Sequence, residues 1–170
     1  MKRWLRFTAA VLAAAFLFAL TGCGSSTNSA SFTWFVDSIP ANLDPQVASG
    51  ASDVIACENL YGTLVRKDPD GELVPGLCEK WTVSSDGLTY TFTMKDGLTY
   101  AAAKGAATEY DITAEDFVFA FRRIFRADTA SPYAVEFSAI KNSAAVQAGL
   151  ADENSLGVSA NGALTLVFRL

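Results

Sequence analysis

The residues best suited to covalent chemistry in this chain of 170 residues are its three cysteines, because the sequence contains no histidine. Thiols can be acylated or joined in a disulfide, so this chemistry centres on Cys23, Cys57 and Cys78. The lack of histidine removes the commonest general base, the Ser-His-Asp and Cys-His arrangements and most zinc sites. Carboxylate-only catalysis stays open, but no two acids stand in a context that marks them as more than surface charge. We therefore expect neither an enzyme nor a metal or cofactor site.

Cys23 stands where an apolar segment ends and a Gly/Ser-rich segment begins. A positively charged start followed by the uncharged residues 7–20 is the layout of an export signal, and this run is shorter than the roughly 20 residues of a membrane-spanning helix. The stretch Leu20-Thr21-Gly22-Cys23 resembles the bacterial lipobox, in which the chain is cleaved just before the cysteine and the cysteine is acylated. We predict that residues 1–22 are a lipoprotein signal peptide and that Cys23 carries palmitate-like acyl chains.

The segment after the apolar run is suited to a tether. Residues 23–31 consist mostly of Gly, Ser, Thr and Asn without periodicity, so we expect a flexible linker. Acyl chains on its first residue contribute about 0.8 kcal/mol per buried methylene and would hold the protein at a membrane surface. The alternatives are an ordinary secretory signal that happens to contain a cysteine, and an uncleaved anchor helix.

The charge of the remaining chain argues against nucleic acid as a partner. Residues 1–22 contain three of the 13 basic residues and none of the 18 acidic ones, which leaves ten basic and 18 acidic residues and a net charge of −8. Such a surface repels phosphate. The one basic cluster, Arg122, Arg123 and Arg126, lies in a single predicted helix, where we expect a solvated face.

Cys57 and Cys78 are left once Cys23 is assigned to lipid. In an exported chain two thiols can pair, and they can equally stay reduced and buried. Sequence alone leaves both states open.

Hydrophobic periodicity and turn residues predict a mixture of helices and strands. The predicted helices span residues 53–64, with Ser52 or Asp53 as the cap, and about 113–126, with a capping box at Thr113-Ala114-Glu115-Asp116. In the second helix, four apolar residues share one face and should pack on the hairpin predicted at residues 81–94. Further helical segments are expected at residues 76–80 and 139–150.

Alternating apolar residues predict the strands. A short strand is expected at residues 32–36, a hairpin at residues 81–94 with its turn at 84–87, and a second hairpin at residues 158–168 around an Asn-Gly turn. Residues 99–111 are Ala-rich and form a loop in this prediction. The expected class is α+β, with a mixed sheet, hairpins and packed helices.

Several stretches, in this order and spacing, resemble the extracytoplasmic solute-binding proteins of peptide ABC importers, the oligopeptide- and dipeptide-binding lipoproteins of solute-binding family 5. The resemblance covers nearly all of residues 32–170. The stretches are Leu43-Asp44-Pro45, Asn59-Leu60-Tyr61-Gly62-Thr63-Leu64-Val65, Leu73-Val74-Pro75-Gly76-Leu77-Cys78-Glu79-Lys80-Trp81, Val83-Ser84-Ser85-Asp86-Gly87-Leu88-Thr89-Tyr90-Thr91-Phe92, Lys95-Asp96-Gly97, and Ile112-Thr113-Ala114-Glu115-Asp116-Phe117-Val118-Phe119-Ala120-Phe121-Arg122-Arg123.

The resemblance implies a two-lobed, class II type periplasmic-binding-protein-like fold that closes on its ligand. Residues 32–170 would be the N-terminal part of it, as a fragment whose second lobe is absent. The ligand would be an oligopeptide or dipeptide, held by its main chain, and the partners would be ABC permease subunits and membrane lipid. The family's ligand-contacting loop corresponds to Ser49, Gly50 and Ala51. The chain departs from the family pattern at residues 100–105, so the conformation of that loop is not implied.

The resemblance places the protein outside the cytoplasm, tethered to the cell membrane in the periplasmic space or on the outer face of the cytoplasmic membrane. Other ligands remain open, since relatives on this scaffold also take nickel chelates, haem or sugars. A cell-envelope hydrolase and a structural lipoprotein are the alternatives from other functional classes. The first lacks a recognisable nucleophile and base, and the second leaves the ordered motifs unexplained.

Overall fold

The computed structural model describes residues 33, 35, 37–102 and 110–170 and divides the chain into two compact units, Met1–Phe35 and Val36–Leu170. The predicted signal peptide, Cys23 and the tether lie outside the described residues. Most of the strand predicted at residues 32–36 also falls outside them, and the two described residues there, Thr33 and Phe35, are not in a strand. All elements below belong to the second unit.

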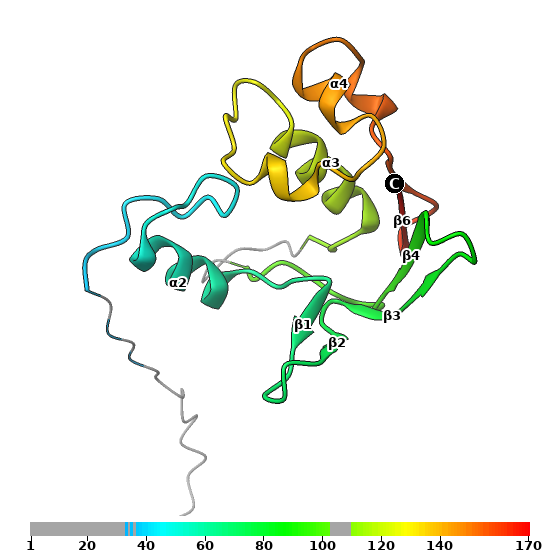
Figure 1. Ribbon diagram of the computed structural model, residues 1–170. Helices are drawn as coiled ribbons and strands as arrows, with labels where there is room; N and C mark the ends of the chain where they lie inside the picture. Colours follow the sequence, from blue (N-terminus) through cyan, green and yellow to red (C-terminus); the bar gives the residue numbers. More distant parts are fainter. Residues whose placement is uncertain (1–32, 34, 36, 103–109) are drawn as a thin grey trace, which may run out of the picture. The chain divides into compact units, whose positions relative to one another are not determined.

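The larger of the two described sheets of this unit has four antiparallel strands in the order β3-β4-β6-β5. Figure 1 labels three of them, β3, β4 and β6. Both predicted hairpins are confirmed: β3 pairs with β4 across the turn at residues 84–87, and β5 pairs with β6 across the Asn161-Gly162 turn. Pairing of β4 with β6 joins the two hairpins. The strands are β3 (Cys78–Val83), β4 (Thr89–Met94), β5 (Val158–Ala160) and β6 (Thr165–Arg169).

The amphipathic helix α3 (Ala114–Ile124) covers one face of the sheet, and two of its aromatic residues, Phe117 and Phe121, pack against the core. The ring of Phe121 packs edge-on against Phe168 of β6, with 4.8 Å between ring centroids, and Phe168 in turn contacts Phe92 of β4. Phe125, just after the helix, is 1% exposed. The predicted apolar face is therefore confirmed, but it packs mainly on β5 and β6 rather than on the first hairpin.

The start of α3 shows the predicted capping box. The carboxylate of Asp116 accepts hydrogen bonds from the backbone N–H of Thr113 at 2.7 Å and from its hydroxyl at 3.0 Å. A carboxylate in the first turn also interacts favourably with the positive end of the helix. The start of α3, the helix that carries Arg123, is thus determined by hydrogen bonds between residues three positions apart.

The helical turn predicted at residues 76–80 is wrong, because Cys78 already belongs to β3. The helix predicted at residues 139–150 is present but shorter, as α4 (Ser143–Gln147). Residues 68–72 close a small hairpin of β1 (Val65–Lys67) and β2 (Leu73–Pro75), which the sequence patterns did not predict. The remaining helical segments are the 3-10 turns η1 (Ala134–Phe137) and η2 (Glu153–Ser155).

The first helix, α2 (Ala51–Leu60), begins and ends earlier than predicted. Its N-cap is Gly50, and the expected caps Ser52 and Asp53 lie inside its first turn, where both are buried. Their side chains bind the preceding segment instead of the helix amides: Asp53 Oδ1 accepts from the N–H of Ala41 at 2.7 Å, and Ser52 Oγ accepts from the N–H of Ser38 at 3.3 Å. The predicted caps are therefore side-chain anchors for residues 38–42.

The predicted loop at residues 99–111 is closed at its base by an isolated antiparallel bridge between Thr99 and Asp111. Residues 103–109 of this loop lie outside the described residues. Among the helices that are described, none has the length and apolar character needed to cross a membrane.

Candidate functional site

The predicted ligand-contacting residues Ser49, Gly50 and Ala51 lie side by side at the start of α2, and all three are exposed. Gly50 has an extended backbone conformation, with φ of −70° and ψ of 147°. In the described part of the chain, the backbone N–H groups of these three residues have no hydrogen-bond partner. Free amides at a helix N-terminus carry partial positive charge and can donate to a carbonyl or carboxylate group. We call residues 49–51 the amide loop.

The residues just before the amide loop form a tight turn around Asp44. The carbonyl of Asp44 accepts from the N–H of Val47 at 3.1 Å and of Ala48 at 2.8 Å. Its carboxylate accepts from the N–H of Gln46 at 3.0 Å. Asp44 thus stabilises the conformation of residues 44–48, which lead directly into the amide loop.

Arg123 of α3 holds this turn from a distant part of the sequence. Its guanidinium donates Nη1 to Asp44 Oδ1 at 3.0 Å and Nη2 to Asp44 Oδ2 at 2.5 Å, a bidentate ion pair. Nη1 also donates to Gln46 Oε1 at 2.9 Å. Hydrogen bonding to Arg123 lowers the pKa of Asp44 below its ordinary value. The prediction of a merely solvated face was therefore wrong for Arg123.

Three further hydrogen bonds join the same turn to α3 and to the loop after it. The side chain of Gln46 donates Nε2 to the carbonyl of Ala120 at 2.7 Å. Ser131 Oγ donates to the carbonyl of Gln46 at 2.6 Å, and the hydroxyl of Tyr133 donates to the carbonyl of Ala48. The amide loop is consequently attached to a rigid support on its N-terminal side and continues into α2 on the other.

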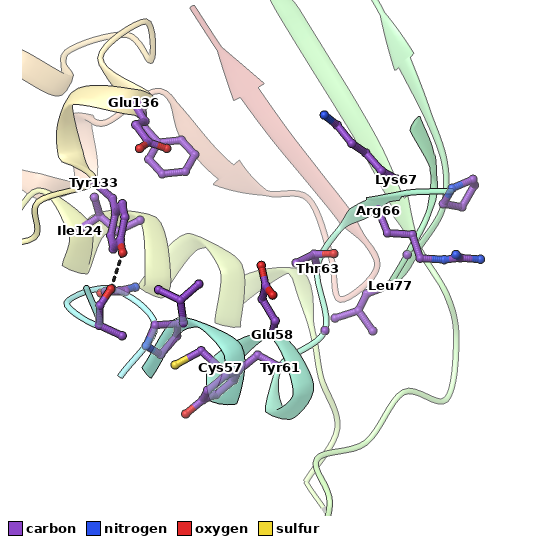
Figure 2. A pocket seen from close by; sticks show the side chains of 18 of the residues that line it. Cys57, Glu58, Tyr61, Thr63, Arg66, Lys67, Leu77, Ile124, Tyr133 and Glu136 are labelled. Carbon is purple, nitrogen blue, oxygen red and sulfur yellow. Dashed lines mark hydrogen bonds between the residues drawn. The ribbon is translucent and has the colours of Figure 1, made fainter. Parts of the chain in front are cut away.

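An open cavity of about 1140 Å³ lies beside this arrangement. Figure 2 shows Cys57 and Glu58 of α2, with Tyr61 just after it, on one side of the cavity and Tyr133 with Glu136 on the other. Its wall combines apolar side chains with charged ones of both signs, the charged ones being Glu58, Arg66, Lys67, Lys95 and Glu136. Gln46 and Ala48 line the cavity, whereas the three residues of the amide loop do not, so the loop borders it only through its supporting turn.

The two remaining cysteines are separate, free thiols, so the disulfide alternative is not found in this structure. Cys57 lies in the last part of α2 and Cys78 at the start of β3, and both are buried. Burial raises the pKa of the Cys57 thiol, and the negative charges of Asp53 and Asp44 raise it further. A buried thiol with a raised pKa is a poor nucleophile, because the thiolate is the reactive form. Cys57 therefore contributes packing to the cavity wall.

No group of three or more potential metal ligands occurs among the residues that the structure describes. The polar side chains around the amide loop bind one another and the backbone. This arrangement can hold the main chain of a bound molecule through exposed amides, and it offers no nucleophile paired with a base.

Sequence reasoning missed the contributions of Gln46, Arg123, Ser131 and Tyr133. Each makes a hydrogen bond to a residue 74 or more positions away in the chain. Neither helical periodicity nor turn composition carries information on such pairs. The available signal was the presence of both Leu43-Asp44-Pro45 and Arg122-Arg123 in the ordered set of motifs.

Comparison with known proteins gives one matching family. Residues 72–170 match the family described as "Bacterial extracellular solute-binding proteins, family 5 Middle". The periplasmic murein peptide-binding protein MppA of Escherichia coli is 35% identical over 133 residues, a match that covers 77% of this chain and 24% of that protein. The probable deoxycholate-binding periplasmic protein YgiS of Escherichia coli is 35% identical over 129 residues, covering 75% of this chain and 23% of that protein.

Solved structures agree with the sequence matches. The structure of Haemophilus influenzae OppA in complex with RPPGFSPFR superposes on this chain with a TM-score of 0.66 at 31% identity, covering 76% of this chain and 25% of that one. The described α+β arrangement is thus found in periplasmic peptide-binding proteins. The chain spans about a quarter of the length of the relatives it matches.

Proposed function

Because the chain belongs to family 5 of the bacterial extracellular solute-binding proteins, we propose that it supplies the peptide-contacting amide loop of a substrate-binding component for a peptide ABC importer. Proteins of this family bind solutes and are not enzymes. The likeness to a solved peptide-binding protein supports the expectation that residues 32–170 are the N-terminal part of a two-lobed fold. The ligand, the partners and the anchor are inferences, since the chain spans only about a quarter of those relatives.

A peptide is the favoured ligand because of the amide loop. Three adjacent exposed residues present N–H groups without partners in the described part of the chain, at the positive end of α2. The carbonyl groups of an extended peptide are the natural acceptors for such donors, and recognition through the main chain tolerates many side chains. The names of two similar proteins also favour a peptide ligand: MppA is called a murein peptide-binding protein, and OppA was solved with the peptide RPPGFSPFR.

A bile acid is the alternative ligand, and the name of YgiS supports it. Deoxycholate offers a rigid apolar body and one carboxylate. It would use the cavity beside Tyr133 and Tyr61 more than the amide loop, because that wall is partly apolar and carries cationic side chains. The two ligands should therefore affect different residues of the protein.

The N-terminus supplies the proposed location. With Cys23 acylated and residues 23–31 as a tether, the domain would stay at the membrane surface, where it could deliver its ligand to permease subunits. This proposal depends on the lipobox-like stretch and on the extracellular location of the family.

A peptide titration followed by NMR tests the ligand assignment. Residues 24–170, labelled with nitrogen-15, are titrated with trialanine and, in parallel, with deoxycholate. We expect trialanine to shift the amide signals of Ser49, Gly50 and Ala51 most, with a dissociation constant weaker than about 1 mM, because this chain matches only about a quarter of the length of a peptide-binding relative.

A set of shifts confined to residues outside the amide loop would contradict the assignment of the peptide to this loop. Trialanine binding at millimolar affinity or tighter in calorimetry would contradict the expected weak affinity, because it would mean that this chain forms a complete site. Strong shifts with deoxycholate alone, at Tyr61 and Tyr133, would favour the alternative ligand.

A further inference from the structure

We propose that Arg123 is a positioning residue for the amide loop: it touches no ligand itself but holds residues 44–48 so that the N–H groups of residues 49–51 stay exposed and aligned. This inference rests on the proposed function, because the alignment matters only if the loop binds a ligand. It assigns a ligand-binding role to an ion pair between α3 and the N-terminal segment.

The first step of the argument is the geometry of the contact. Two guanidinium nitrogens of Arg123 meet both carboxylate oxygens of Asp44, and one of them also reaches Gln46. A bidentate pair of this kind fixes the relative orientation of the two groups as well as their distance. Lysine cannot reproduce it, because an ammonium group has no planar fork.

The second step is that Asp44 makes both the long-range contact with Arg123 and the local hydrogen bonds of the turn. The same carboxylate that binds Arg123 also accepts the N–H of Gln46, and the Asp44 carbonyl accepts those of Val47 and Ala48. Without Arg123, the half-buried carboxylate keeps a local partner but loses the long-range one. The turn would then be joined to α3 and to the loop after it only through the hydrogen bonds of Gln46, Ser131 and Tyr133, without the ion pair that fixes its orientation. The turn, and the amide loop with it, would gain freedom to move relative to α3.

The third step is that α3 is itself well fixed. Its Thr113 and Asp116 form the capping box, and Val118, on its buried face, is 1% exposed. A side chain that extends from such a helix is an appropriate anchor for a surface loop. Arg123 therefore links residues 44–48 to a helix that is itself fixed on the sheet.

Arg126 provides a matched control. It lies three positions further along the chain and pairs in a bidentate manner with Asp128, at 3.0 and 2.7 Å, but both side chains are exposed and close in sequence. An exposed local ion pair of this type contributes little to stability. Arg126→Gln removes the same charge as Arg123→Gln without touching the turn at residues 44–48.

Hydrogen exchange of residues 24–170 tests the structural half of the proposal. In Arg123→Gln we expect the amides of Gln46, Val47 and Ala48 to exchange about tenfold faster or more than in the parent chain, with the strands β4 and β6 unchanged. Arg126→Gln should leave all of these rates unchanged. Equal rates in Arg123→Gln and the parent chain would overturn the proposal, and so would a general loss of protection in the sheet.

The trialanine titration tests the functional half. Arg123→Gln should reduce the shifts of the Ser49, Gly50 and Ala51 amides at a given peptide concentration at least threefold, Arg123→Lys should reduce them to an intermediate extent, and Arg126→Gln should keep them. If the parent chain shows these shifts and Arg123→Gln shows them equally, the positioning role is wrong while the proposed function stands. If the parent chain shows no shifts there, the proposed site fails, and the positioning role fails with it.

Discussion

Replacing Phe125 by alanine is expected to lower the free energy of unfolding by about 3 to 5 kcal/mol. Phe125 is 1% exposed and belongs to the core cluster that α3 forms with β5 and β6. Removing its ring takes away the transfer free energy of a large apolar group and leaves a cavity that the neighbours fill only in part. A loss of this size is comparable to the whole stability of many domains.

Urea denaturation of residues 24–170, followed by circular dichroism, measures this effect. Phe119→Ala is the matched control, because Phe119 lies on the same helix and is 62% exposed. We expect that variant to change the free energy of unfolding by less than about 0.5 kcal/mol. A small effect of Phe125→Ala, or equal effects of the two substitutions, would show that α3 is not seated on the sheet as described.

Replacing Cys23 by serine is expected to move the protein from the membrane fraction to the soluble extracytoplasmic fraction. Serine cannot form the thioether or accept the processing that we predict for this position, so the mature chain would lack its acyl chains. The expected shift follows because acyl chains hold a lipoprotein at the membrane through their buried methylene groups.

Mass spectrometry of the mature N-terminus and metabolic labelling with an alkyne fatty acid measure this outcome. The parent chain should begin at an acylated Cys23, and Ser25→Ala should behave like the parent. Retention of residues 1–22, or an unmodified Cys23 on a chain that still sediments with membranes, would contradict the anchor.

Elements with strong local signals could be predicted from sequence. The two hairpins followed from alternating apolar residues and from turns such as Asn161-Gly162, and the start of α3 followed from the Thr113 to Asp116 spacing. In each case, the residues that determine the element lie within a few positions of one another. Local hydrogen bonds and binary patterning are sufficient there.

Elements with polar residues in ambiguous roles were predicted less well. Ser52 and Asp53 are typical caps, yet here they bind the backbone of residues 38–42 from inside α2. Short-range statistics cannot distinguish these uses, because the partner approaches only after the chain has folded. The same applies to residues 76–80, where pairing with β4 overrides a weak helical tendency.

In the candidate site too, some residues were indicated by the sequence and others were not. The sequence resemblance indicated Ser49, Gly50 and Ala51, and the structure puts these residues together at the exposed start of α2. Arg123, which supports them, lies on α3, more than 70 positions away in the chain. Its charge suggested a solvated surface, and only the fold reveals the ion pair with Asp44.

The most direct test of the central claim, that backbone amides of residues 49–51 bind the ligand main chain, is the trialanine titration of Gly50→Pro beside Gly50→Ala. Proline removes the N–H of residue 50, and its fixed φ of about −65° matches the −70° of Gly50. Alanine adds the same Cβ near Asp53, at 3.2 Å from Oδ2, but keeps the donor. We predict that Gly50→Ala retains the peptide-induced shifts of Ser49 and Ala51 and that Gly50→Pro loses most of them. Equal shifts in the two variants would contradict the account.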